Sequence, residues 1–474
     1  MQGWEYFLIG SALLGCIALA SRIFEGAWIS PAMLFVFAFF SATFVYAYSI
    51  ESLPHSISSF AYENFEKAYA ISTQSFAALL VGYVIYWLAP GAQWQGRRGL
   101  ALLDPFMSPT AALMLGRFTL LLCAFFIIYN IDAGTFSTVR GENAYLTDED
   151  VNLIDRFGFA ITQILPSLIL ALFIAAQGLV GRARRRVMNM VWLSAATILL
   201  VTLISFNRLL AVTMLATLVI AVHYRIQPLG VWQISLVLAV LLALQAVRGL
   251  RDLGIPLTDL DLQMIARFLF QDSDSASITA LLQSLVMGIA GWDVFTNVLN
   301  FVPQIEDYKY GATYLSSLIG LLMPRVLGLS SYSDFTLSSW YMELYAPGTT
   351  SHGFDFSMLA EAYINFGYLM PLFFLVVGFL LAMLSATLVR TRSPAKLFFA
   401  VIAILTIAFS LRSDSNVLFK GVFYKTVPVL VLIYMARRVY PRSAGIATRR
   451  TARAETNPSG GSAALRLTPH PPGA

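Results

Sequence analysis

Charged residues are scarce in this sequence. Lys, Arg, Asp and Glu make up only 12% of its 474 residues, whereas hydrophobic residues make up 58%. A soluble domain is about a quarter charged, so a chain of soluble domains is excluded and a membrane protein with many spans is indicated. The excess of Lys and Arg (31) over Asp and Glu (26) gives a net charge of +5. Taken alone, that basic balance would suggest a nucleic-acid partner.

Cysteine and histidine are scarce as well. The two cysteines, Cys16 and Cys123, lie in apolar runs without CxxC spacing, which is typical of small buried hydrophobic residues and excludes a disulfide framework. The four histidines are scattered, so no metal site is predicted. The chain also lacks the Walker, GxGxxG, GxSxG and HExxH patterns, and ATP-driven transport and serine hydrolysis therefore have no support.

Long apolar runs are abundant. A helix needs roughly 20 mostly apolar residues to cross a bilayer, and runs close to that length predict an all-α polytopic membrane protein with about 11 transmembrane helices. The run at 356–389 is long for one span, so it either tilts or begins as an interfacial helix. The runs are centred near 4–22, 28–49, 69–89, 111–131, 158–180, 188–206, 209–224, 231–247, 356–389, 397–411 and 420–436.

Positive charge orients these spans. The cluster from Arg182 to Arg186 is predicted to be cytoplasmic, and alternation then places 132–157, 248–355 and the Asn207–Arg208 turn outside the cell. The predicted organisation is helices 1–8 in 1–247, a large external loop in 248–355, further spans in 356–440 and a disordered basic cytoplasmic tail in 441–474. Residues 437–474 carry seven Arg and one Glu, a net +6 that leaves −1 for the rest of the chain. The basic balance therefore indicates no nucleic acid.

The loop at 248–355 is too long to be a plain connection, so we predict that it is partly helical and functional. Within it, Ile278–Phe301 is apolar but broken by Gly288 and Gly291. That pattern suits a helix lying on the membrane or over the bundle better than a span.

Four external arginines are candidates for binding a pyrophosphate: Arg140, Arg208, Arg325 and Arg412. Guanidinium is permanently charged and forms two parallel hydrogen bonds with phosphate oxygens. The alternative for each is an ion pair or a membrane anchor, although Arg208 is fixed tightly in a short turn. Glu361, one turn into an apolar helix and near His352, is a candidate general base. Its alternative is a structural ion pair with an arginine.

Several short motifs stand in a characteristic order within and after the large loop. Together with the topology, they resemble the Wzy-type polymerases of O-antigen repeat units. After Pro324-Arg325 the sequence reads Val326-Leu327-Gly328, where a Trp/Lys-Pro-like continuation is expected, so the subfamily and the substrate stay open. The matching motifs are Tyr310-Gly311-Ala312-Thr313-Tyr314, Pro324-Arg325, Glu361-Ala362-Tyr363-Ile364-Asn365-Phe366-Gly367 and Arg412.

The resemblance implies a bacterial inner-membrane enzyme with a cytoplasmic C-terminus and a periplasmic loop. Such an enzyme moves a growing glycan from undecaprenyl pyrophosphate onto a new lipid-linked repeat unit, without a nucleotide, metal or other cofactor. Its partners would be the lipid-linked donor and acceptor, membrane lipids and a chain-length regulator protein.

Within that scheme the four arginines would bind the pyrophosphate, and Glu361 or His352, with Glu142 as a weaker candidate, would be the base. Tyr310 and Tyr314 would stack on sugars or anchor in the membrane. The rival functions are an O-antigen ligase-like enzyme, a flippase of lipid-linked sugars and a non-catalytic subunit of a polysaccharide machine.

Overall fold

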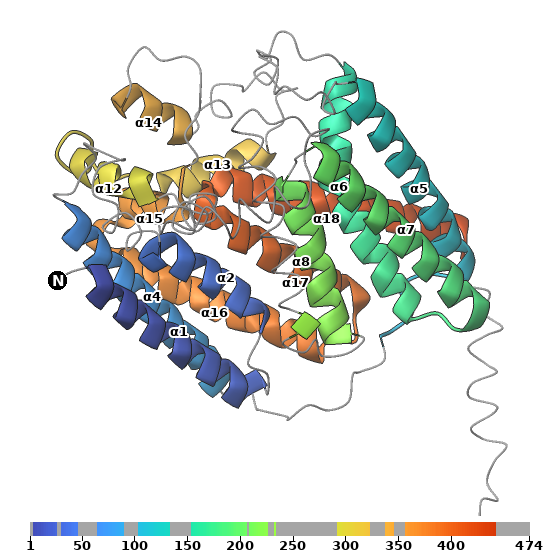
Figure 1. Ribbon diagram of the computed structural model, residues 1–474, viewed down its shortest axis with the longest axis horizontal. Helices are drawn as coiled ribbons and strands as arrows, with labels where there is room; N and C mark the ends of the chain where they lie inside the picture. The colour runs from blue at the N-terminus through green and yellow to red at the C-terminus, as the bar shows by residue number, and fades with distance from the viewer. Residues whose placement is uncertain are drawn as a thin grey trace, which may run out of the picture.

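The computed structural model describes ten stretches of the chain, and every regular element in them is a helix (Figure 1). The all-α prediction is confirmed for these residues. The predicted span at 231–247, apart from 232–233, and the tail beyond residue 441 lie outside them. The described residues are 3–25, 30–45, 64–89, 103–132, 153–205, 208–225, 232–233, 292–322, 337–345 and 356–441.

One group of helices is built around α4 (Phe65–Leu88) and α16 (Met370–Arg390). These two run side by side, with α1 (Gly3–Glu25), α2 (Pro31–Phe40) and the π-helical turn η1 (Ser41–Val45) packed against them (Figure 1). Proline stands at the start of α2 and of α16, where its missing N–H has no helical partner to lose. Buried Phe and Tyr rings from α1, α2, α4 and α16 fill the core between these helices.

Glycine allows α4 and α16 to meet backbone to backbone. A Cβ atom at Gly82 would lie 1.9 Å from the carbonyl oxygen of Leu375, and one at Gly378 would lie 2.0 Å from that of Leu79. Small residues permit such close approach in membrane helix pairs, where van der Waals packing drives association. The two helices therefore form the closest pair in the first group.

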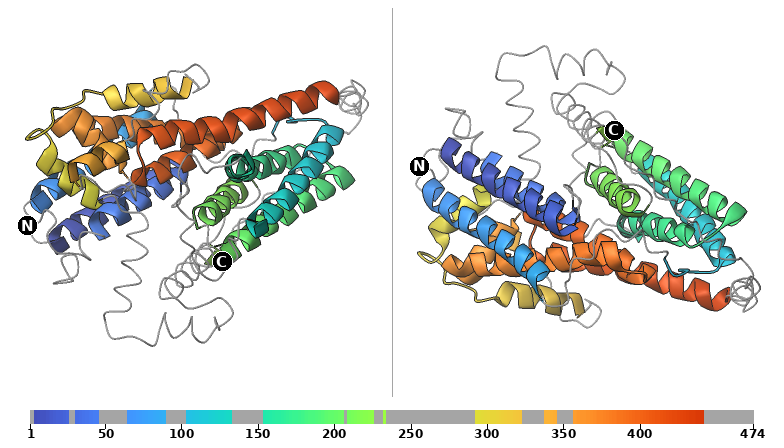
Figure 2. Two further views of the ribbon diagram at one scale, coloured as in Figure 1. Left: turned by 90° about the horizontal axis from the view of Figure 1, so that it is seen from above. Right: turned by 90° about the horizontal axis from the view of Figure 1, so that it is seen from below.

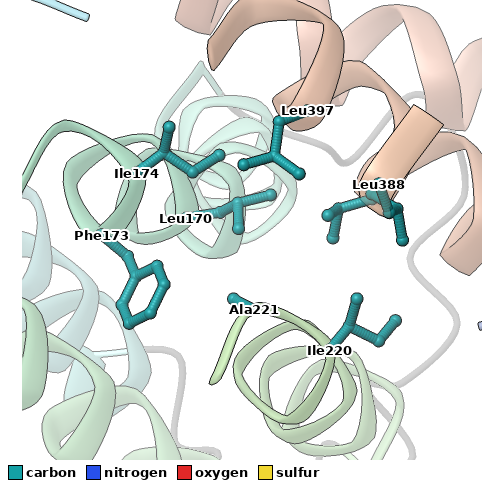
Figure 3. A pocket seen from close by; sticks show the side chains of 8 residues that line it. Leu170, Phe173, Ile174, Ile220, Ala221, Leu388 and Leu397 are labelled. Carbon is teal, nitrogen blue, oxygen red and sulfur yellow. The ribbon is translucent and has the colours of Figure 1, made fainter. Parts of the chain in front are cut away.

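A second group contains α5 (Pro109–Asp132), α6 (Leu153–Gln177), α7 (Gly181–Ser205), α8 (Arg208–Arg225) and α17 (Pro394–Phe409). Both views in Figure 2 show α5 to α7 apart from α1 and α4. The last helix, α18 (Ser415–Val439), contacts α17, α6 and α5. Between α6, α8, α16 and α17 lies a small pocket lined only by apolar side chains such as Leu170, Ile220 and Leu388 (Figure 3).

Short helices gather at the end of the bundle where α16 begins, which we call the α13 end (Figure 1). They are α12 (Trp292–Phe301), α13 (Ala312–Leu322), α14 (Leu337–Tyr345), α15 (Met358–Phe366) and the 3₁₀ turns η7 (Gly367–Leu369) and η8 (Ser410–Arg412). Three of these helices come from the loop predicted at 248–355, so its described residues are partly helical, as expected. The side of the membrane on which they lie stays a prediction.

The long apolar run at 356–389 is interrupted rather than continuous. Helix α15 ends at Gly367, whose φ of +53° is a left-handed conformation that favours glycine, and η7 leads into α16. The two predicted alternatives are a tilted span and an interfacial first helix. The break at Gly367 separates α15 from α16, and an interfacial position of α15 stays a prediction.

Seven helices in the described stretches are long and apolar enough to cross a membrane. The predicted total of about 11 stays a prediction. The expected runs at 28–49 and 209–224 contribute shorter apolar helices, Phe35–Val45 and Leu210–His223. The seven are Trp4–Glu25, Phe65–Leu88, Pro109–Ile131, Ala160–Gln177, Met358–Arg390, Pro394–Arg412 and Ser415–Val439.

The opposite end of the bundle joins the two groups through backbone carbonyl groups and cationic side chains. Asp104 N donates to the carbonyl oxygen of Arg392 at 3.1 Å, and the guanidinium of Arg437 donates to that of Phe106. Arg390 lies 5.1 Å from the ring centroid of Trp87. Arginines from two separate segments of the chain, 390–392 and the end of α18, therefore lie at this end.

Candidate functional site

The first helix of the interrupted run, α15, places the Glu361 motif inside the protein. Its N-cap is Ser357, whose hydroxyl accepts a hydrogen bond from Ala360 N at 3.1 Å. Every residue from Met358 to Asn365 is buried. A helix buried on all sides can hold polar side chains only if other elements supply their hydrogen-bond partners.

The carboxylate of Glu361 has three such partners. Its Oε1 accepts from the hydroxyl of Thr313 at 2.7 Å and from the hydroxyl of Ser415 at 2.6 Å. Its Oε2 accepts from the backbone N–H of Ser415 at 2.6 Å. Ser415 is the first residue of α18, so the carboxylate lies at a helix N-terminus, where the helix dipole favours negative charge. Only 1% of Glu361 is exposed.

Asn365, one turn after Glu361, also connects the Glu361–Gly367 motif to the Tyr310–Tyr314 motif. Its Oδ1 accepts from Gly311 N at 2.9 Å, while its Nδ2 donates to the hydroxyl of Thr313 at 2.6 Å and to the carbonyl oxygen of Glu361 at 2.8 Å. The Thr313 hydroxyl therefore accepts from Asn365 and donates to Glu361. We call Glu361, Asn365, Thr313 and Ser415 the polar junction, because it joins α13, α15 and α18.

Gly367 makes room for an aromatic contact beside the polar junction. A Cβ atom there would lie 2.7 Å from the ring of Tyr308. The Tyr308 hydroxyl is 3.5 Å from that of Tyr363, and Lys309 N donates to the carbonyl oxygen of Ile364 at 2.9 Å. The segment before α13 therefore lies directly on the end of α15.

The two tyrosines predicted to bind sugar have different surroundings. Tyr310 is 82% exposed, whereas the ring of Tyr314 stacks on Phe366 and Phe373, at centroid distances of 5.9 and 5.3 Å. The Tyr314 hydroxyl has no hydrogen-bond partner among the described residues. Burial, and then the negative charge of Glu361, raise the pKa of Tyr314 well above its usual value. Only Tyr310 offers a free ring face for stacking.

The turn that carries Arg412 lies beside the polar junction. Asp414 caps α18, its Oδ1 accepting from Val417 N at 3.1 Å, and Arg412 lies two residues before it in η8, which contacts α15. Burial raises the pKa of Asp414, and hydrogen bonds from the backbone N–H groups of Val417, Leu337 and Asn416, together with Lys420, oppose that rise. An arginine and two carboxyl groups thus come from segments that meet at one end of the bundle.

The other predicted site residues are not tested by these contacts. Arg208 begins α8, but the structure does not describe its side chain. Arg140, Glu142, Arg325 and His352 lie outside the described residues.

Sequence reasoning missed three members of the polar junction. Thr313 and Asn365 stood inside the motifs but had no role assigned, and Ser415 was not considered. For Ser415 a signal existed, since Asp414 before an apolar run predicts an N-cap and therefore a helix that begins there.

Comparison with known proteins gives one match. A family model described as O-antigen polysaccharide polymerase Wzy matches residues 118–443, which is more than half of the chain and includes every member of the polar junction. Neither the curated proteins nor the solved structures contain a match.

Proposed function

The chain belongs to the O-antigen polysaccharide polymerase Wzy family, and we propose that it transfers a growing glycan from undecaprenyl pyrophosphate to a new lipid-linked repeat unit at the periplasmic face of the inner membrane. Family membership implies a multi-pass membrane glycosyltransferase that polymerises O-antigen repeat units. Five finer points belong to the proposal: the lipid carrier, the face of the membrane, the transfer in blocks, the reaction without a metal ion and a chain-length regulator as partner. The observation that carries it is the docking of the Tyr310–Tyr314 motif on the Glu361–Gly367 motif.

The proposed orientation has support from charge. Arg390, Arg392 and Arg437 lie at the end of the bundle opposite the polar junction. Lys and Arg are enriched on the cytoplasmic side of membrane proteins, so the α13 end would face the periplasm and the C-terminus the cytoplasm.

The chemistry needs charge balance for the leaving group. The bond from the anomeric carbon of the donor to the pyrophosphate oxygen breaks, and that oxygen keeps the electron pair. We assign Arg208, Arg325 and Arg412, with Arg140 in support, to the pyrophosphate, because fixed guanidinium groups stabilise the charge that develops there. The position of Arg412 beside the polar junction supports its share of this role.

The new glycosidic bond forms from an acceptor hydroxyl oxygen, and its proton passes to a base. The candidates are His352 and Glu361, with Glu142 as the third. The three donors on Glu361 and its 1% exposure favour a role in anchoring the polar junction. These observations favour His352 as the base that takes the proton from the acceptor hydroxyl. Of the tyrosines, exposed Tyr310 is the better candidate for stacking on sugar, and the stacked Tyr314 the poorer one.

A deletion strain separates the proposed polymerase from its rivals. Its lipopolysaccharide should carry single repeat units on the lipid core and lack the ladder, which is the series of gel bands from polymers of increasing length. The wild-type gene should restore the ladder. Loss of all repeats from the core would indicate a ligase or a flippase instead, and an unchanged ladder would exclude all three activities.

Single variants then assign the residues. Complementation with Arg325→Ala or Arg412→Ala should leave single repeats only. Complementation with Arg412→Lys should restore little of the ladder, because an ammonium group cannot form the two parallel hydrogen bonds that a guanidinium forms with phosphate oxygens. A full ladder from Arg325→Ala or His352→Ala would remove that residue from the scheme.

A further inference from the structure

Beside the polar junction, the α13 end carries a group of tyrosines whose rings meet edge to face. Tyr308 contacts Tyr310 and Tyr363 at centroid distances of 6.3 and 6.0 Å, and Tyr363 contacts Tyr368 at 6.3 Å, with interplanar angles of 67° to 82°. Tyr363 is fully buried beneath the others, whereas Tyr310 is 82% and Tyr368 65% exposed. We call Tyr308, Tyr310 and Tyr368 the tyrosine surface.

The backbone holds the most exposed of these rings in place. Tyr310 has a φ of +48°, a left-handed conformation that is uncommon for residues other than glycine. Two hydrogen bonds fix the segment on either side of it, from Lys309 N to the carbonyl oxygen of Ile364 and from Gly311 N to Oδ1 of Asn365. A strained residue persists only where its surroundings determine it, and such residues cluster at binding sites.

A lysine from a distant helix completes the surface. The ammonium of Lys67, near the start of α4, lies 5.5 Å from the ring centroid of Tyr368 and 5.7 Å from that of Tyr363. It braces the rings by cation–π attraction and still has N–H groups to donate. Rings, hydroxyls and an ammonium donor thus occupy one small area.

This chemistry fits a carbohydrate better than a lipid surface. A tyrosine offers an apolar ring with a polar tip, which complements the apolar face and the hydroxyl rim of a pyranose. The same segment carries Asp307 and Glu306, the latter paired with Lys309 at 2.8 Å. Acidic groups of this kind disfavour contact with anionic lipid headgroups.

We propose that the tyrosine surface, with Lys67, is a binding site for the glycan chain itself, separate from the lipid and pyrophosphate. The inference rests on the proposed function and deepens it, because it gives the sugar part of the substrate its own subsite. Gly367 and Asn365 connect this surface to the polar junction, so a bound glycan lies next to the elements that carry Glu361 and Arg412.

The test uses full-length protein in lipid nanodiscs and titrates it with polysaccharide of the source strain. Mild acid first removes the lipid and pyrophosphate, so that binding reports the sugar alone. Wild-type protein should bind, and Tyr310→Ala and Tyr368→Ala should each weaken the Kd about tenfold, the loss of one good aromatic contact.

Three variants separate sugar binding from membrane anchoring. Tyr310→Phe should keep most of the affinity because it retains the ring, whereas Tyr310→Leu should lose it although it retains apolar bulk. Tyr424→Ala removes a tyrosine on α18 that is 48% exposed and should bind as wild type does. Unfolding temperatures close to that of wild type show that these exposed positions leave the fold intact.

The outcomes distinguish the two proposals. Failure of wild-type protein to bind the polysaccharide, or equal binding by wild type, Tyr310→Ala and Tyr368→Ala, overturns the tyrosine surface. A different result separates the two proposals: wild-type protein binds the polysaccharide, both alanine variants lose this binding, and the deletion strain keeps an unchanged ladder. That result supports the tyrosine surface as a glycan site and overturns the proposed polymerase function.

Discussion

The short helices at the α13 end and the helices α5 to α8 with α17 both contain buried polar groups, but these groups differ in the partners they use. In the second group, Thr119, Asn130 and Thr217 donate to carbonyl groups four residues earlier in their own helices. At the α13 end, Asn297 of α12 bonds to Tyr341 of α14 and Glu361 of α15 bonds to Ser415 of α18, each across two elements.

This difference shows where the protein depends on particular residues. A hydroxyl bonded within its own helix adds nothing to the register between helices, and an apolar core tolerates swaps of similar volume. A bond between elements fails if either partner moves or changes. Substitutions of the bonded groups at the α13 end should therefore affect both folding and activity, whereas substitutions of apolar residues in the core of the second group should affect stability alone.

The largest effect is expected at the crossing of α4 and α16. Gly378→Leu places side-chain atoms against the backbone of Leu79, which costs about 3 kcal/mol or more because neither backbone can yield. The variant should fail to accumulate in membranes. Its matched control is Gly15→Leu on α1, where a Cβ meets no atom within 4 Å. Equal accumulation of the two variants would contradict the close packing, as measured by membrane fractionation and thermal unfolding.

The next effect is expected at Glu361. Glu361→Gln puts an amide donor opposite the Ser415 N–H or leaves a hydroxyl without its acceptor, at about 2 kcal/mol. Thermal unfolding should detect this, and the ladder should shorten or disappear.

Thr313→Val distinguishes a structural role of Glu361 from base catalysis, because it removes one hydrogen-bond donor to the Glu361 carboxylate and leaves the carboxylate itself in place. If Glu361 anchors the junction, this variant should lower the unfolding temperature and weaken the ladder as Glu361→Gln does. A normal ladder from Thr313→Val, beside none from Glu361→Gln, would support the base role instead.

A smaller effect is expected at Gly367. Gly367→Ala adds a Cβ at positive φ, at about 1 to 2 kcal/mol, and pushes on the ring of Tyr308. Gly181→Ala is the control, since its φ is +62° and a Cβ there meets no atom within 4 Å. Gly181→Ala should lose somewhat less stability than Gly367→Ala, because it lacks the contact with Tyr308, and only Gly367→Ala should alter the ladder. An altered ladder in both would trace the effect to stability alone.

The smallest effect is expected in the apolar pocket between α6 and α17. Ala221→Val adds apolar volume to a small space lined only by apolar side chains, and it should change the free energy of unfolding by about 1 kcal/mol or less. The length distribution of the ladder should stay as in wild type. A changed distribution would show that the second group also takes part in activity.

Much of the fold followed from the sequence. Apolar runs predicted a membrane-spanning helical protein, and the length of the loop at 248–355 predicted that it is partly helical. Resemblance in short motifs predicted the family, which is confirmed. The break at Gly367 followed only in part, because an apolar run shows its length but not the φ of one residue within it.

The polar junction could not be predicted, because its bonds join residues far apart in the chain. Thr313 and Glu361 are 48 residues apart and Glu361 and Ser415 are 54. Hydrophobic periodicity places each residue on a helix but does not pair the helices. Sequence reasoning therefore expected Glu361 to be a base or to pair with an arginine, whereas its described hydrogen bonds come from hydroxyl and backbone groups. The assignments to Arg140, Arg208, Arg325, Arg412, His352 and Glu142 stay predictions.

The polar junction also bears on how the chain is made. Thr313, Glu361 and Ser415 leave the ribosome in that order, and Ser415 opens the last helix. Two of the three donors to the carboxylate therefore arrive only when α18 has been synthesised and inserted. Until then a buried carboxylate lacks most of its partners, which is costly inside a protein. The junction is thus complete only in a chain that has been translated through α18.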